Sequence, residues 1–330
     1  MPIPFIIAGV ALAAGSFGAK KGYDAYQDYD QAGSLNKEAR NLYNEAEGQL
    51  NEQRSDTQKK LEALGKLKFY LYDEQLPEFV KVASSIKNID FQKTDYALDN
   101  VLTEIELQSF SHQINMISDS LSSGVTALGS GGLAGLAAYS GAGWLATAST
   151  GTAISSLSGV AATNATLAWF GGGSIAAGGM GMAGGTMILG GIVAGPVLAV
   201  GGMMLASKAA EAKENAYSNL AQSRLAVEQM KSAELKAKTI GHRVSEIAFV
   251  LQGLSLQFEK AVVALEFIVN KSKDFSTYSE HERNHIGKTF ALAKTIKNIL
   301  DMKLLSENGE LVAGQEAVIQ ESNQLLEQVS

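Results

Sequence analysis

The strongest constraint on this sequence is a long internal stretch that carries no charge. From Ser120 to Ser207, 88 residues in all, there is no Asp, Glu, Lys or Arg, and the stretch holds 22 of the 34 glycines of the chain. Asp119 precedes it and Lys208 follows it. Charged side chains cover most soluble protein surfaces, so a charge-free block of this length has to be packed inside the protein or placed in lipid.

The rest of the composition excludes several classes of function. A net charge of −7 and a pI of about 5.3 argue against a protein that binds nucleic acid through a basic surface. The chain contains no cysteine, which excludes disulfides, thiolate zinc sites, iron–sulfur clusters and a cysteine nucleophile. We expect no cofactor and no nucleic-acid partner.

The N-terminal residues are apolar as well. Residues 1–19 carry no charged side chain, and Lys20 and Lys21 follow them. A helix of about 18 residues spans roughly 27 Å, slightly less than the hydrocarbon core of a bilayer. Three interpretations stay open: an apolar helix that meets membrane, a buried packing helix, and a secretory signal that lacks the usual basic start. If the helix spans, Lys20 and Lys21 keep the following chain cytoplasmic.

Apolar residues recur at helical spacing before the block. Residues 23–76 place Leu and Ala on one stripe, which Lys68 interrupts, and no proline lies between Pro4 and Pro77. The pattern predicts one long helix, with Pro77 marking a break or the first turn of the next helix. Residues 88–94 read as a loop. The apolar face of a second helix comprises Val101, Leu102, Ile105, Phe110, Ile114, Ile117 and Leu121.

The same periodicity returns after the block. Residues 205–269 predict another long helix, 271–279 a loop, 281–306 a helix and 314–328 a short final helix. The stripe of the long helix comprises Ala216, Leu220, Leu225, Met230, Ile240, Val244, Ile247, Leu251, Leu254, Phe258, Val262, Leu265 and Ile268. Strand signals are weak outside the block. We therefore expect an all-α protein, an elongated bundle of long antiparallel helices that carries a Gly/Ala-rich hydrophobic helical hairpin as its head.

Four regions follow from these patterns. They are an N-terminal apolar helix (1–22), the first half of the bundle (23–122), the hydrophobic Gly/Ala-rich head (123–207), and the second half of the bundle with the C-terminal helices (208–330).

The most hydrophobic part of the block is residues 167–206, of which 187–206 have the length of one transmembrane helix. Residues 123–148 are weakly apolar, and 149–166 read as a small, hydroxyl-rich connector. The residues that we expect to enter a membrane are Ala134, Trp144, Leu167, Trp169, Phe170, Met187, Ile188, Leu189, Ile192, Val193, Val197, Leu198 and Val200.

Small residues recur at every fourth position within the block. This spacing lets helix backbones approach closely in lipid, whereas in water each glycine costs a helix about 1 kcal/mol relative to alanine. The glycines that we expect to pack helices together are Gly131, Gly135, Gly173, Gly181, Gly185, Gly191 and Gly195. The alternative is a Gly/Ala-rich hairpin that stays buried as the head of a soluble bundle.

Two resemblances add to this interpretation. Residues 147–179, TASTGTAISSLSGVAATNATLAWFGGGSIAAGG, resemble a block shared by a family of bacterial glycine-rich, membrane-associated proteins of undefined function. The overall plan resembles that of α-helical pore-forming toxins of the cytolysin A and Hbl/Nhe type, which have long bundle helices and a central hydrophobic hairpin. The second resemblance implies membrane insertion, and it is one of architecture, not of sequence motif.

Two motifs point elsewhere. His281, Glu282 and His285 form an H-E-x-x-H pattern, in which two histidines one helical turn apart bind zinc and the glutamate activates water. Against a zinc protease stand Arg283 beside the expected metal, the lack of a downstream histidine, and a polar helix start with Ser279 as the N-cap. Gly179, Gly181 and Gly184 match a dinucleotide fingerprint but lack its strand and its acidic partner, so close helix packing explains them better.

We therefore expect a membrane-inserting, oligomerising protein that forms pores in or perturbs a bilayer and that performs no catalysis. Its partners would be the lipid bilayer and further copies of itself or a related helical protein. The location would be membrane-associated, with a soluble form before insertion; a cytoplasmic and a secreted protein both stay open. The alternatives are a resident membrane scaffold with long cytoplasmic helices and, at a greater distance, a zinc metalloprotease.

Overall fold

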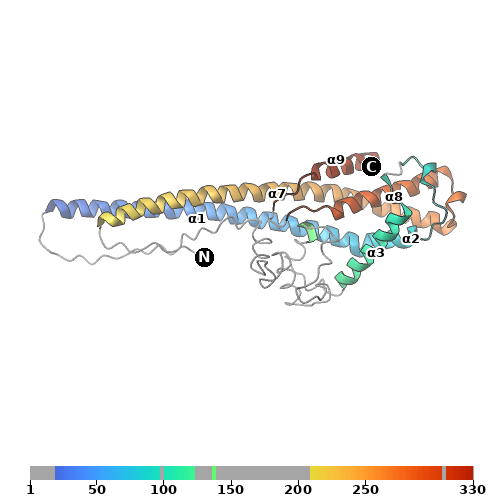
Figure 1. The fold of residues 1–330 in the computed structure, drawn as a ribbon, viewed down its shortest axis with the longest axis horizontal. Coiled ribbons are helices and arrows are strands. Elements are labelled where there is room, and N and C mark those ends of the chain that lie inside the picture. Colours follow the sequence, from blue (N-terminus) through green and yellow to red (C-terminus); the bar gives the residue numbers. More distant parts are fainter. Residues whose placement is uncertain (1–18, 97–99, 123–135, 139–208, 307–309, 330) are drawn as a thin grey trace. The chain divides into compact units, whose positions relative to one another are not determined.

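The described part of the chain is all-α, as the sequence predicts. The computed structural model describes residues 19–96, 100–122, 136–138, 209–306 and 310–329, and this part contains helices and two isolated bridges but no strand (Figure 1). The α-helices are α1 (Ala19–Tyr70), α2 (Leu76–Ala83), α3 (Glu104–Ser122), α7 (Ala209–Lys271), α8 (Glu280–Asp301) and α9 (Gln315–Val329). The short helices are η1 (Leu71–Gln75), η2 (Phe91–Lys93) and η7 (Phe275–Thr277).

The junction between α1 and α2 shows how the chain accommodates Pro77. The turn η1 is a π-helix, in which the Leu76 N–H donates to the carbonyl of Leu71. Pro77 then lies in the first turn of α2, directly after this π-turn. Of the two expectations for Pro77, the first helical turn is the one observed.

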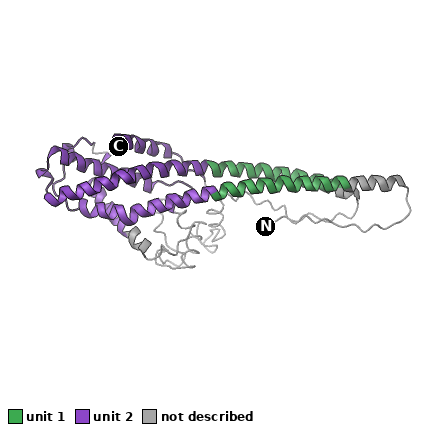
Figure 2. Cartoon of the chain, turned by 180° about the vertical axis from the view of Figure 1, so that it is seen from behind, with its two compact units in different colours: residues 1–55, 193–238 green, residues 56–192, 239–330 purple. Residues whose placement is uncertain are grey.

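The described residues fall into two compact units, each of which combines chain from before and after the charge-free block (Figure 2). In unit 1, the part of α1 up to Ser55 pairs with α7 up to Lys238. The side-chain amide of Asn219 donates to the side-chain oxygen of Asn36 at 3.0 Å, and Arg224 meets Glu38 at 3.2 Å. Residue numbers rise together along both helices, so the two helices run in the same direction.

Unit 2 contains the rest of the described chain and repeats this parallel arrangement. A Cβ atom on Gly241 of α7 would lie 3.1 Å from the Thr57 hydroxyl of α1, and the Ser255 hydroxyl donates to Gln75 at 2.9 Å. The expected antiparallel pairing is therefore wrong for α1 and α7, which are far apart in the sequence and can pair in either direction. It is right for α7 and α8, which a short connection joins: Lys271 meets Glu282, and Ala261 meets His285.

The core of unit 2 is built around phenylalanines from distant parts of the chain. The ring of Phe79 in α2 lies 5.3 Å from that of Phe258 in α7 and 5.2 Å from that of Phe290 in α8, and Phe91 lies 5.1 Å from Phe290. The tilted and edge-on geometries are those that aromatic quadrupoles favour. This cluster joins α2, η2, α7 and α8.

Most residues of the predicted stripes are buried, with two clear exceptions. Ile105 in α3 is 80% exposed, and Leu107 is buried in its place. Leu225 in α7 is 58% exposed, while Ala226 and Val227 beside it are buried. In both places the expected spacing is off by one or two positions, which on a helix turns a residue from the inner to the outer face.

We predict that Phe79→Ala lowers the free energy of unfolding by about 3–5 kcal/mol, because it empties the centre of the aromatic cluster. The control is Ile105→Ala, which shortens a large apolar side chain that is 80% exposed and should change stability by less than about 0.5 kcal/mol. Urea unfolding of the full chain, followed by far-UV circular dichroism, measures both. Equal losses for the two variants would contradict the assignment of the core.

Candidate functional site

A three-residue piece of the charge-free block is packed against unit 2. Leu136, Ala137 and Ala138 are 0–1% exposed. The Ala138 carbonyl accepts two backbone hydrogen bonds, from the N–H groups of Leu304 at 3.0 Å and Leu305 at 3.1 Å. The Ala137 carbonyl accepts one from the Nζ of Lys68 at 3.2 Å. We call this arrangement the seat: residues 136–138, Lys68 of α1, and Leu304 and Leu305, which follow α8.

Lys68 is buried, although the stripe of α1 would favour an apolar residue at its position. Its neighbours along the stripe, Leu61, Leu64 and Leu71, are 0–2% exposed, and Lys68 itself is 2% exposed. Burial lowers the pKa of Lys68 to about 8, and the charge of Asp301 partly opposes this effect. A buried ammonium is tolerated only where it is paired and hydrogen-bonded, and here the carbonyl of Ala137 supplies the hydrogen bond.

Two further polar groups face the same region. Tyr72 is fully buried one turn after Lys68, and its hydroxyl has no hydrogen-bond partner among the residues that the structure describes. Burial raises the pKa of Tyr72, and the charge of Asp301 raises it further. Asp301, the last residue of α8, accepts from Gln113 of α3 at 3.0 Å and pairs with Lys297 at 2.6 Å. Lys68 and Lys297 thus act on one carboxylate.

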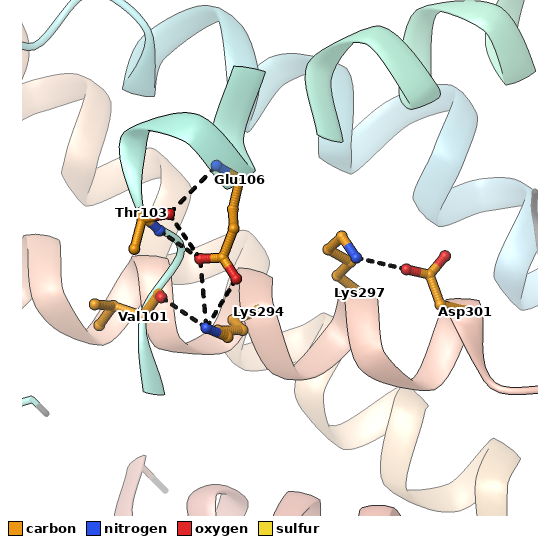
Figure 3. A network of polar contacts seen from close by, with 6 residues as sticks. All are labelled: Val101, Thr103, Glu106, Lys294, Lys297 and Asp301. Carbon is orange, nitrogen blue, oxygen red and sulfur yellow. Dashed lines mark hydrogen bonds and ion pairs between the residues drawn. The ribbon is translucent and has the colours of Figure 1, made fainter. Parts of the chain in front are cut away.

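The helix that leads into the charge-free block is tied to α8 at a second level (Figure 3). Thr103 caps the N-terminus of α3: the Glu106 carboxylate accepts from the Thr103 N–H and hydroxyl, and the Thr103 hydroxyl accepts from the Glu106 N–H. Lys294 of α8 reaches the same carboxylate at 3.1 Å and the Val101 carbonyl at 3.2 Å. Burial alone would raise the pKa of Glu106, but the hydrogen bonds from Thr103 and Lys294 lower it overall.

Together these contacts tie α3 and the start of the charge-free block to α8 and to the residues after it. Glu106 bonds Lys294, Gln113 bonds Asp301, and the Ala138 carbonyl accepts from Leu304 and Leu305. Residue numbers rise together in the two segments across these three contacts. In chemical terms, the arrangement holds a hydrophobic segment by a few polar bonds.

The residues that we expect from the sequence to enter a membrane or to pack helices through glycine, from Gly131 to Val200, lie outside the described residues. So do residues 1–18 and the Gly179 motif. The sequence does not predict the seat. Its signal in the sequence is Lys68, the one charged residue on an otherwise apolar stripe.

The H-E-x-x-H motif has a structural role at the start of α8. Ser279 is the N-cap, as predicted, and forms a capping box with Glu282. Hydrogen bonds from the Ser279 N–H, Lys271 and the Ser279 hydroxyl lower the pKa of Glu282 to about 2. His285 donates from Nε2 to the Ala261 carbonyl at 3.0 Å. Over the described ranges, no three His, Asp or Glu side chains come together as metal ligands.

One described helical stretch, Lys213–Lys271 in α7, is long and apolar enough to cross a membrane by length and composition. Within its most apolar window, 44% of the residues are buried inside the protein. A core helix of a soluble bundle passes the same test, and Phe258 and Leu265 of this stretch are core residues of unit 2. Membrane association therefore receives weak support from this helix.

We predict that the stability of the full chain rises between about pH 8 and pH 10. With the seat formed, Lys68 loses its proton near pH 8, whereas a solvated lysine keeps it to about pH 10.4. The unfolded chain therefore binds more protons in this window, and stability increases with pH by up to roughly 3 kcal/mol. Tyr72 would make stability fall with rising pH, but only above the ordinary tyrosine pKa of about 10, where the unfolded chain loses this proton.

The measurement is the urea midpoint at several pH values below 10. Lys68→Gln is the control, since an amide can still donate to Ala137 without carrying a charge, and it should lose most of the rise. If the two chains show the same dependence on pH, Lys68 is not the group that titrates.

We also predict that purified full-length protein binds no stoichiometric zinc, because Glu282 is engaged in the capping box and His285 bonds to the backbone. Elemental analysis after dialysis against zinc tests this. One zinc per chain that disappears in His281→Ala would restore the metalloprotease hypothesis.

Comparisons of this chain with models of known protein families, with curated proteins and with solved structures find no match.

Proposed function

We propose that this chain is a membrane-inserting, oligomerising protein that forms pores in a lipid bilayer or perturbs it, with the charge-free block as the inserting element. The observation that carries the proposal is the seat, at which a helical unit holds the block by Lys68 and by two backbone hydrogen bonds to Ala138. On this proposal the seat keeps the block on the protein in water and lets it go at a membrane.

The composition of the block supports insertion. No residue from Ser120 to Ser207 would take a charge into the hydrocarbon core, where each charged side chain costs several kcal/mol. Glycine spacing suits close helix contacts in lipid, and the resemblances to glycine-rich membrane-associated proteins and to α-helical pore-forming toxins agree with this role. The protein would be membrane-associated, with a soluble form before insertion.

The energetics of the seat support a reversible attachment. Breaking its three hydrogen bonds costs about 1 kcal/mol each when water replaces the lost partner. Release also returns the Lys68 ammonium to water, which offsets part of this cost. The remaining cost of opening the seat is small enough for the transfer of apolar helices into a bilayer to offset it, since burial of each CH₂ group contributes about 0.8 kcal/mol.

The first test is dye release from liposomes by the full chain and by a chain that lacks residues 123–206. We expect the full chain to bind vesicles and release dye, and the shortened chain to do neither. A protein that stays bound but leaves vesicles intact at every pH and lipid composition would contradict the proposal and favour the resident scaffold. Cell fractionation adds a second readout. A resident scaffold should always need detergent for extraction, whereas the inserting protein should be found partly in the soluble fraction.

Overpacking the seat tests its role in insertion. Ala137→Leu adds volume at a fully buried position and should weaken the seat by about 1–3 kcal/mol, which corresponds to dye release that is about 5- to 150-fold faster. The matched control is Ala221→Leu, which adds the same volume at an exposed position of α7 and should leave the rate unchanged. An unchanged rate in Ala137→Leu would show that opening of the seat does not limit insertion.

A further inference from the structure

The parallel course of α1 and α7 brings the beginnings of both helices to one end of unit 1 (Figure 2). The contact between Asn36 and Asn219 sets the register of the pair. At 1.5 Å per residue, Ala19 lies about 26 Å before Asn36 along α1. Ala209 lies about 15 Å before Asn219 along α7. We call this the starting end of unit 1; in an antiparallel pair the two beginnings would lie at opposite ends.

Each of the two helices follows a long stretch without charge. Residues 1–19 precede Lys20, and residues 120–207 precede Lys208, which stands directly before α7. Within the second stretch, residues 187–206 have the length of one transmembrane helix. The starting end is therefore the point at which two apolar segments from distant parts of the sequence join unit 1.

The order of charges after the two apolar segments is the same. Lys20 and Lys21 come first at α1, and the first carboxylate, Asp24, comes three positions after Lys21. Lys208 comes first at α7, and Glu211 comes three positions later. The ammonium groups are thus nearest to the apolar segments, where lysine can reach lipid headgroups while its stem stays in apolar surroundings. Both flanks favour the same side of a membrane.

The two beginnings also lie at nearly the same level. In the register of the pair, Lys21 lies about 23 Å before Asn36, so Lys21 and Ala209 differ by about 8 Å along unit 1. The headgroup layer on one side of a bilayer is roughly 5–8 Å deep. One membrane face can therefore receive both segments.

The described surface of unit 1 offers no apolar face that could cover residues 1–18 instead. From Asp30 to Ser55, every exposed residue of α1 is polar or glycine. On α7 up to Lys238, the large apolar side chains that are exposed stand well apart along the helix: Tyr217, Leu225 and Leu235. An apolar segment of this length is therefore better accommodated by lipid than by the helix pair.

We infer that the starting end of unit 1 faces a lipid bilayer, with Lys20, Lys21 and Lys208 at the level of anionic headgroups. Residues 1–18 then enter the membrane beside residues 187–206 and in the same direction. The inference rests on the membrane contact of the proposed function. It adds a second inserting segment and identifies which end of unit 1 meets the bilayer.

Because the chain contains no cysteine, single cysteines labelled with the fluorophore NBD can locate this end in the full-length protein. Gly22→Cys and Ala209→Cys mark the two beginnings and keep all three lysines. Gly48→Cys is the matched control, since Gly48 is exposed on α1, has open space around it and lies about 39 Å beyond Gly22. On phosphatidylglycerol vesicles that carry a nitroxide at the headgroup, we expect quenching at 22 and 209 and none at 48.

Three results would overturn the inference. Bound protein whose labels at 22 and 209 stay unquenched does not face the bilayer with this end. Quenching at 209 without quenching at 22 means that residues 1–18 lie away from the membrane. Quenching at 48 as strong as that at 22 means that unit 1 lies flat on the surface.

The charges of the starting end provide an independent measurement. Replacing both Lys20 and Lys21 by glutamine should weaken cosedimentation with phosphatidylglycerol vesicles about 30-fold, since each basic residue at an anionic surface strengthens binding about fivefold. The matched control replaces Lys37 and Lys59, which are exposed farther along α1. Both lie more than a Debye length from the starting end, so binding should change less than about twofold. Equal losses would mean that overall charge, not the starting end, binds the vesicles.

Dye release keeps this inference separate from the proposed function. Labels that are quenched at 22 and 209 while the vesicles stay intact remove only the proposed pore-forming or perturbing activity. Vesicles that empty while the label at 22 stays unquenched remove only this inference. Protein that binds no vesicles removes both.

Discussion

The burial of one ammonium group governs how unit 2 holds the charge-free block. Lys68 replaces an apolar residue on the inner stripe of α1, and a buried charge is stable only with a hydrogen-bond acceptor and an opposite charge near it. The acceptor is the carbonyl of Ala137, and the charge belongs to Asp301. While it is buried, Lys68 therefore needs residues 136–138 in place, and their release returns its ammonium group to water. This mutual dependence makes the seat specific and, at the same time, weaker than an apolar contact of the same size.

The helix α8 is the common support of these contacts. It supplies Lys294 to the cap of α3, Asp301 to Gln113, and the chain after it to Ala138. Its other face packs on the aromatic cluster through Phe290. Stability of the core and attachment of the block thus share one element, so a change that shifts α8 would affect both.

The sequence predicts the helical class and most of the inner stripes, since periodicity and the absence of proline depend only on local structure. It misses the parallel course of α1 and α7, because local periodicity does not set the direction in which two helices far apart in the sequence pair. The errors at Ile105 and Leu225 arise where neighbouring apolar residues compete for the inner face. Lys68 departs visibly from its stripe in the sequence, yet its partner is a backbone carbonyl, which no side-chain pattern in the block reveals.

The most direct test of whether the seat releases the block is hydrogen exchange at the amides of Leu304 and Leu305, measured in water and after vesicles are added, together with dye release. Both amides donate to Ala138, so they should be protected in water. We predict that protection is lost when vesicles are added, no later than the dye escapes. Amides that stay protected while the vesicles empty would mean that the seat does not open, and that the charge-free block is not released from unit 2 to act on the membrane.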